Sequence, residues 1–187
     1  ADLNSLAAWS RTWLLNFNEE KCVVLRVRAS IQYMYTLNGH PLKQVGQQKD
    51  LGIIISDSLK PSSHVSYVAN KGMQRLGMIR RCFTSLTENK VKTLYTSMVR
   101  PILEYGSPAW NPWLKKDIDV LDKVQRRCER MCTSENFKLE SLKERRKQTD
   151  MTETYKYLNK KYKTDPSTLF STPDRSLRGH SQKPFKP

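Results

Sequence analysis

The sequence predicts an α+β protein, with a helix plus a small antiparallel sheet, then a helical bundle and a disordered basic tail. Short runs rich in β-branched residues fall within residues 21–56, as strands require. From residue 61 apolar residues recur every three or four positions, which is the period of amphipathic helices. Beyond Thr164 the chain is rich in Ser, Pro, Lys and Arg and has too few apolar residues to form a core.

The first part of the chain is expected to form one helix and several short strands. The helix should end near residues 16–18, and its apolar residues at helical spacing are Leu3, Leu6, Ala7, Trp13 and Leu14. Asn38-Gly39 is a strong signal for a tight turn between two strands. The strands are predicted at residues 21–28, 32–37, 41–45 and 50–56.

Three longer helices follow. The first begins near residue 61, Thr87 can cap the second, and the third runs from about Lys116. Pro101 should kink or end the second helix, because proline has no N–H to donate. The apolar face of the first helix consists of Val65, Val68, Gly72, Leu76, Ile79 and Phe83. That of the second consists of Val91, Leu94, Tyr95, Met98 and Val99, and that of the third of Ile118, Leu121, Val124, Cys128 and Met131. Further helical pieces are expected at residues 139–146 and 152–162.

The positive charge of the chain is regional. Of the net charge of +15, residues 1–59 carry +1, residues 60–130 carry +8 and residues 131–187 carry +6. A field of one sign that begins at residue 60 indicates a polyanion partner, although a basic protein can also be basic for solubility alone. No run of 18 apolar residues occurs, so no membrane partner is expected.

The four cysteines are expected to be reduced and mostly buried, because their spacing is irregular. Cys128 and Cys132 lie four residues apart on one helical face and could hold a metal ion. No second pair and no nearby histidine completes such a site, so no metal is predicted.

Two basic stripes are candidates for nucleic-acid binding, since phosphate contacts need charge and reach rather than base-edge geometry. The alternative is a solvated helix face, which the i,i+4 pairs Asp119–Lys123 and Asp122–Arg126 support. The residues of the stripes are Lys71, Arg75, Arg80, Arg81, Lys116, Lys123, Arg127 and Arg130.

The aromatic and imidazole side chains give weaker signals. Trp110 and Trp113 could stack on bases, but tryptophans beside prolines more often anchor a helix junction, and we favour that role. His40, His64 and His180 have no visible acid or nucleophile partner and receive no role.

Several long segments of the chain resemble one protein family. WSRTWLLNFNEEKC, residues 9–22, resembles the helix and strand that follow the catalytic box in LINE-type reverse transcriptases of non-LTR retrotransposons, of the jockey and chicken-repeat kind. YTLNGHPL resembles the family's hairpin, and KDLGIIIS resembles its primer-grip segment. LYTSMVRPILEYGSPAWNPW and DIDVLDKVQRRCERM resemble the thumb of the family. LESLKERRKQTDMTETYKYLN and RSLRGHSQKPFKP resemble its C-terminal ending.

The resemblance implies four regions in a fragment of an RNA-directed DNA polymerase. They are the end of the palm with the primer grip (1–59), a helical thumb (60–133), C-terminal helices (134–163) and a disordered basic tail (164–187). The implied partner is a duplex of RNA template and DNA primer. The resemblance also implies an intracellular ribonucleoprotein, nuclear and cytoplasmic, and magnesium in the full-length enzyme.

The family's Tyr/Phe-Ala-Asp-Asp box is expected upstream of Ala1 and does not occur in this sequence. Two-metal phosphoryl transfer needs those ligands, so we expect neither a cofactor nor polymerase activity in this fragment. We also expect the missing upstream palm to be a partner of this chain. The spacer between Met131 and Leu139 is short for the family, which suggests a truncated or decaying copy. The alternatives are a non-catalytic nucleic-acid-binding module and a non-functional product of a decayed element.

Two sites are implied by the resemblance. Lys21 lies where the family places a lysine near the incoming triphosphate, and it could act as a general acid toward pyrophosphate. A solvated lysine at the start of a strand is the interpretation that we favour there. Asp50, Leu51 and Gly52 match the primer grip, where a glycine lets the backbone approach the 3′ phosphates of the primer. The alternative for this turn is an ordinary strand edge.

Overall fold

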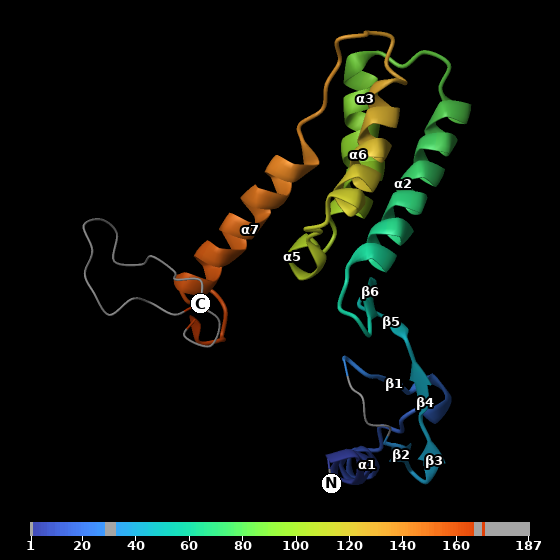
Figure 1. The fold of residues 1–187 in the computed structure, drawn as a ribbon, viewed down its shortest axis with the longest axis vertical. Coiled ribbons are helices and arrows are strands. Elements are labelled where there is room, and N and C mark those ends of the chain that lie inside the picture. Colours follow the sequence, from blue (N-terminus) through green and yellow to red (C-terminus); the bar gives the residue numbers. More distant parts are fainter. Residues whose placement is uncertain (1, 29–32, 167–169, 171–187) are drawn as a thin grey trace, which may run out of the picture. The chain divides into compact units, whose positions relative to one another are not determined.

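The computed structural model describes residues 2–28, 33–166 and 170, and within them the protein is α+β as predicted (Figure 1). The chain divides into two compact units, one of residues 1–71 and 112–120, the other of residues 72–111 and 121–187. Most of the predicted disordered tail, from residue 167 onward except for residue 170, lies outside the described residues. The four functional regions inferred from the sequence remain predictions.

The first unit begins with helix α1, which ends earlier than expected. It spans Asp2–Thr12 rather than reaching residues 16–18, and Leu14 follows with a left-handed backbone (φ 56°). Ala7 is buried, whereas Trp13 and Leu14 are 64% and 86% exposed. The remaining elements before the long helix are η1 (Glu19–Lys21), β1 (Val23–Leu25), β2 (Thr36–Leu37), β3 (His40–Pro41), β4 (Lys43–Val45), β5 (Gln47–Asp50) and β6 (Ile53–Ser56).

The predicted antiparallel strands are present, but they form separate pairs, and one further pair is parallel. Within the described residues the strands form three separate pairs: β2–β3 and β5–β6 are antiparallel, whereas β1–β4 is parallel. The segment predicted as one return strand, 41–45, is divided at Leu42, whose N–H donates to the Tyr35 carbonyl at 2.8 Å. The second half of that segment, β4, pairs with β1 in the parallel sense.

Two tight turns close the antiparallel pairs. Asn38 and Gly39 (φ 52° and 82°) form the turn that the sequence predicted, with both central residues left-handed, as in type I′ hairpins. Leu51 and Gly52 (φ 44° and 89°) form a second turn of this kind between β5 and β6. The strand predicted at 50–56 is therefore a hairpin turn followed by β6. The sequence did not reveal this turn, because leucine is a rare residue at positive φ.

The helical region begins with α2 (Ser62–Cys82), which continues from the first unit into the second. The further helices are α3 (Glu88–Leu94), the π-helical segment η2 (Tyr95–Val99), α4 (Arg100–Glu104), α5 (Ser107–Trp110), α6 (Lys115–Glu129) and α7 (Leu142–Leu158). None of the helices in the described residues has the length and apolar character to cross a membrane. The most deeply buried apolar side chains of the second unit are Leu76, Tyr95, Val99, Leu103, Leu121, Val124 and Leu142.

Pro101 neither ends nor sharply interrupts the second predicted helix. The chain remains helical from Glu88 to Glu104, because a π-helical turn precedes the proline. A wider turn of this kind relieves the clash between the proline ring and the carbonyl four residues earlier. Thr87 stands at the N-cap position, as predicted, but its side chain makes no capping hydrogen bond.

The two helical pieces predicted after residue 138 are one helix, α7. The polar residues between them do not break it, since the Thr149 and Thr152 hydroxyls donate to carbonyls four residues earlier at 3.1 and 2.8 Å. The start of α7 is tied to α4, where Arg145 donates twice to the Glu104 carboxylate, at 2.6 and 3.1 Å.

At Gly72, helix α2 lies close to side chains of α4 and α6. A Cβ atom there would stand 3.0 Å from a Val124 methyl and 3.2 Å from a Leu103 methyl, closer than ordinary contact. At Gly77, on the same helix, a Cβ would meet nothing within 4 Å. The glycine at 72 therefore sets how closely α2 packs on α4 and α6.

We expect Gly77→Ala to raise the free energy of unfolding by about 0.5–1 kcal/mol, because alanine favours helix over glycine. Gly72→Ala gains the same propensity but crowds the core, which costs about 1–3 kcal/mol. Urea unfolding should therefore place Gly72→Ala below Gly77→Ala by about 1–3 kcal/mol. Equal stabilities would contradict the close packing.

Candidate nucleic-acid interface

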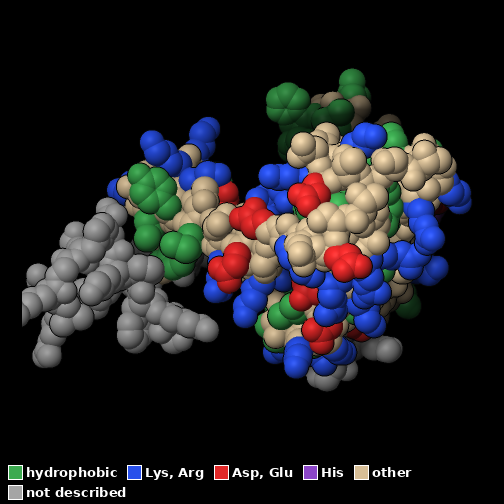
Figure 2. All heavy atoms as spheres, turned by 90° about the horizontal axis from the view of Figure 1, so that it is seen from above, with side chains coloured by type: hydrophobic (Ala, Val, Ile, Leu, Met, Phe, Trp, Pro, Cys, Tyr) green, Lys and Arg blue, Asp and Glu red, His purple; other side chains and the backbone are tan. Residues whose placement is uncertain are grey.

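All eight basic residues of the predicted stripes are exposed in the structure. Figure 2 shows Lys and Arg side chains over much of the helical surface, with Asp and Glu interspersed. Lys71 and Lys116 belong to the first unit, and the other six belong to the second.

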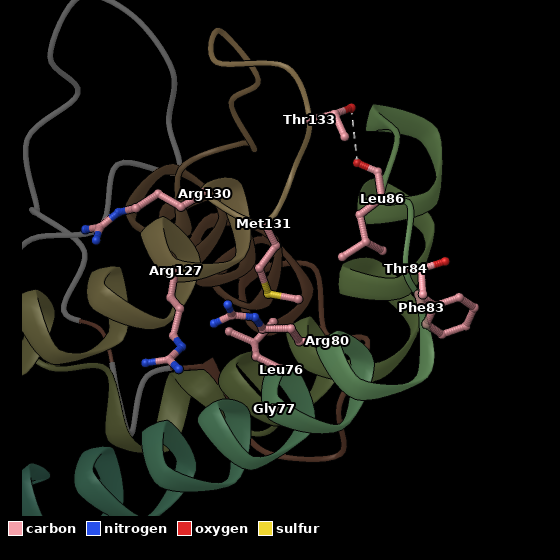
Figure 3. Close-up of a pocket in the computed structure, with 10 residues that line it drawn as sticks. All are labelled: Leu76, Gly77, Arg80, Phe83, Thr84, Leu86, Arg127, Arg130, Met131 and Thr133. Carbon is pink, nitrogen blue, oxygen red and sulfur yellow. Dashed lines mark hydrogen bonds between the residues drawn. The ribbon is translucent and has the colours of Figure 1, made fainter.

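Three of the arginines line one groove of the second unit. Arg80 of α2, Arg127 of α6 and Arg130 just beyond α6 share a hollow of about 640 Å³ (Figure 3). Arg80 and Arg127 extend toward the space between the helices, and Arg130 extends outward. The other lining residues are Leu76, Gly77, Phe83, Thr84, Leu86, Met131 and Thr133.

The helical repeat places these arginines beside the core. Leu76 is buried, and Arg80 follows it by four residues on the same side of α2. Val124 and Cys128 are buried on α6, and Arg127 lies at the edge of that buried stripe. Apolar side chains and arginines therefore line the groove together.

A backbone contact closes one end of the groove. The Thr133 N–H donates to the Leu86 carbonyl at 3.1 Å, and the Thr133 hydroxyl donates to the same carbonyl at 3.5 Å (Figure 3). This contact fixes the chain that leaves α6 against the chain that leaves α2. Arg130 is therefore held near the groove although it lies past the end of its helix.

The groove has no acidic lining. Across the part of the chain that the structure describes, no carboxylate lies within 4.0 Å of the Arg80, Arg127 or Arg130 guanidinium groups. Arg145 differs, because it binds Glu104 at 2.6 Å and Glu140 at 3.0 Å. Three unneutralised guanidinium groups around one hollow produce a local field that attracts anions.

The remaining residues of the stripes lie elsewhere. Arg75, Arg81 and Lys123 are exposed but do not line the groove, and Lys116 is exposed at the start of α6. The Lys71 ammonium group lies 4.7 Å from the centre of the Tyr67 ring, within the first unit. Only part of the predicted set therefore forms a defined site.

The predicted primer-grip residues lie at the tip of the β5–β6 hairpin. Asp50 ends β5, and Leu51 and Gly52 form the turn. The hairpin is joined to α2, since the Ile54 N–H donates to Nδ1 of buried His64 at 3.2 Å. Burial lowers the pKa of His64, and the nearby Lys49 charge lowers it further. His64, which received no role from the sequence, is thus a neutral acceptor that fixes the hairpin.

Lys49 and Tyr67 were missed by sequence reasoning. The Lys49 ammonium group donates to the Tyr67 hydroxyl at 2.8 Å and lies 4.9 Å from the ring centre. The i,i+4 spacing of Tyr67 and Lys71 on a predicted helix was a visible signal for half of this cluster. Lys49 could not be joined to it without knowing how the hairpin packs on α2.

Lys21 lies in η1 rather than at the start of a strand. Its side chain is exposed, and its backbone N–H donates to the Asn18 side chain at 3.2 Å. The structure leaves its role as a general acid untested.

The two tryptophans differ. Trp110 is 4% exposed, and its Nε1–H donates to the Tyr105 carbonyl at 2.8 Å, so the predicted anchoring role is confirmed for this residue. Trp113 is 64% exposed, so the anchoring role is wrong for it.

The four cysteines are free thiols. Cys128 is buried and Cys132 partly buried, but Cys82 is exposed, which corrects the expectation of mostly buried thiols for that residue. Among the described residues no group of three or more His, Cys, Asp and Glu side chains is placed to hold a metal ion.

Burial raises the pKa of Cys128 to about 12, and the neighbouring Glu129 charge acts in the same direction. At pH 8 its reactive thiolate fraction should be on the order of 10⁻⁴. We therefore expect a maleimide to label exposed Cys82 first, and Cys128 only after unfolding in urea. Mass spectrometry of the wild type and Cys82→Ser would resolve the two sites. Labelling of folded Cys128 as fast as Cys82 would contradict the buried position of this face of α6.

Comparisons with known proteins found related sequences. A Drosophila melanogaster protein described as a probable RNA-directed DNA polymerase from transposon BS is 28% identical over 138 residues, which cover 70% of this chain and 15% of that protein. An uncharacterized Caenorhabditis elegans protein is 30% identical over 98 residues, 48% of this chain and 50% of that protein. No family model and no solved structure matches the chain. The chain spans only part of both relatives, and it is related to a region of a transposon RNA-directed DNA polymerase.

Proposed function

We propose that this chain binds the duplex of an RNA template and a DNA primer, as the primer-grip and thumb part of a non-LTR, LINE-type retrotransposon reverse transcriptase. The observation that carries the proposal is the groove with three unneutralised arginines, in a chain related to a transposon RNA-directed DNA polymerase. Guanidinium groups suit this role, because their planar N–H donors match the oxygens of a phosphate.

Binding through the groove would be independent of sequence. Contacts to phosphates set position and register but do not read bases. A polymerase has to hold any primer–template sequence, so contacts of this kind meet its need. The further exposed cations Arg75, Arg81, Lys116 and Lys123 would add long-range attraction that salt screens.

The β5–β6 turn would contact the primer end. Gly52 has a backbone (φ 89°) that other residues rarely adopt, and it has no Cβ to obstruct a strand. Asp50, Leu51 and Gly52 are all exposed, so the turn is accessible.

Catalysis would belong to an upstream palm that carries the aspartate pair. In this proposal magnesium would be held by that palm, because two-metal phosphoryl transfer needs the aspartate ligands. Exposed Trp13 and Leu14 offer apolar surface for that palm to cover. In this proposal the full-length protein works as a ribonucleoprotein in the nucleus and cytoplasm, and Lys21 could act as a general acid only when joined to the palm.

A non-catalytic nucleic-acid-binding module is the second candidate. The same groove supports it, because phosphate binding needs no polymerase partner. A third candidate is the non-functional product of a decayed element, which would be expected to lose the apolar packing seen at Gly72.

Changing Arg80, Arg127 and Arg130 together to Gln should weaken binding to an RNA–DNA duplex and flatten its salt dependence. Each lost phosphate contact removes about 0.9 from the slope of log K against log salt, so the slope should fall by about two to three. Fluorescence anisotropy at several salt concentrations measures this.

The matched control changes Lys90, Lys92 and Lys143 to Gln, which are exposed and lie outside the groove in the same unit. Its slope should stay within about one of the wild type. Equal flattening by both triple variants would show that net charge, rather than the groove, binds the duplex. An unchanged slope in the arginine variant would place the contacts in the basic tail.

The chain alone should not extend a primer. A reaction with RNA template, DNA primer, magnesium and all four deoxynucleotides should give no product above buffer, while an active reverse transcriptase extends the same substrate. Template-dependent extension that EDTA abolishes would sink this part of the proposal.

A further inference from the structure

Two ammonium groups converge on one phenol in the first unit. Lys49 of β5 donates to the Tyr67 hydroxyl at 2.8 Å, and the Lys49 and Lys71 ammonium groups lie 4.9 and 4.7 Å from the Tyr67 ring centre. The hydrogen bond from Lys49 and the nearby Lys71 ammonium group lower the pKa of Tyr67. The three side chains come from two elements, so the cluster exists only when the hairpin is packed on α2.

The cluster holds positive charge without a nearby carboxylate. In the described ranges neither ammonium group has an acidic oxygen within 4.0 Å. Asp50 follows Lys49 directly, but successive residues of a strand point to opposite faces. Two like charges brought together in this way are stabilised when an anion joins them.

The hydrogen-bond donors of the cluster are matched to an oxyanion. When an ammonium group donates to the Tyr67 oxygen, the hydroxyl proton is left to donate onward. Each ammonium group also has further protons, since lysine carries three donors. Several donors with no competing acceptor suit the oxygens of one phosphate.

We propose that Lys49, Tyr67 and Lys71 form a binding site for a single phosphate group of a nucleic-acid strand, beside the β5–β6 turn. The identity of the ligand rests on the proposed function. Two residues of the site, Lys49 and Tyr67, were not part of the predicted interface. Lys49 lies one residue before Asp50, so a phosphate held here positions a strand against the turn. His64, which accepts from the Ile54 N–H, keeps the two elements of the site together.

The test uses the full chain with the variants Lys49→Gln, Lys71→Gln and their double, and Lys43→Gln as the control. Lys43 is an exposed lysine of β4 in the same unit, so its change removes one charge away from the site. Because the salt slope counts phosphates, the double variant should flatten it by about one, not two, relative to Lys43→Gln. If the salt slope of the double variant equals that of the control, or is flatter by about two, the two lysines do not share one phosphate and the proposal is wrong.

Tyr67→Phe keeps the charge and removes one donor. It should weaken duplex binding by about tenfold, which is the loss expected for one hydrogen bond to a charged group, and leave the slope unchanged. Affinity equal to wild type would remove Tyr67 from the site.

A second readout separates this site from the proposed function. In a chain labelled with ¹³C-tyrosine, the Tyr67 ring signal is assigned by its loss in Tyr67→Phe and followed during titration with inorganic phosphate. A saturable shift that Lys49→Gln and Lys71→Gln abolish supports the site even if no duplex binds, in which case the proposed function fails alone. Duplex binding by the wild type without any change at Tyr67 would refute the site and leave the proposed function standing.

Discussion

The candidate interface depends on the close approach of α2 to α4 and α6 at Gly72. A Cβ atom there would meet Val124 at 3.0 Å and Leu103 at 3.2 Å, which is tighter than ordinary van der Waals contact, so the neighbouring side chains would have to move. This contact brings the second half of α2 beside α6, and the arginines that end both helices then border one hollow. The packing of α2 beside α6 therefore places Arg80 and Arg127 around the same hollow.

The arginines of the second unit lie in two kinds of environment, one paired or buried and the other exposed. Arg145 is neutralised by Glu104 and Glu140, and Arg146 is 3% exposed, with a pKa that burial lowers. Arg145 ties the start of α7 to α4 through its hydrogen bonds to Glu104. The charges of Asp122, Glu104 and Asp150 offset part of the desolvation of Arg146. The groove arginines remain exposed and unneutralised, as a phosphate-binding surface requires.

The helices were predictable because their apolar period is regular over many residues, as at Val65, Val68, Leu76 and Ile79. The pairing of the strands was less predictable, because strands of two to four residues carry too little sequence pattern to determine it. No local feature of the sequence indicated that β4 would lie parallel to β1. The Leu51-Gly52 turn was missed because leucine seldom adopts a positive φ.

The sequence identified exposed cations correctly but could not group them. Arg80 and Arg127 are 47 positions apart, and only the packing of α2 on α6 places them in one groove. The cluster of Lys49 with Tyr67 was hidden for the same reason, since a strand and a helix contribute one residue each. Spacing along one helix predicts a face, whereas a site shared by two elements requires their tertiary contact.

The most direct measurement of the central claim is arginine footprinting with phenylglyoxal, read by mass spectrometry with and without an RNA–DNA duplex. Free Arg80, Arg127 and Arg130 should be modified readily, and the duplex should protect all three at low salt but not at high salt. Arg145, already bound to Glu104, should be modified slowly in both states. Full modification of the three groove arginines while the duplex is bound would contradict the account.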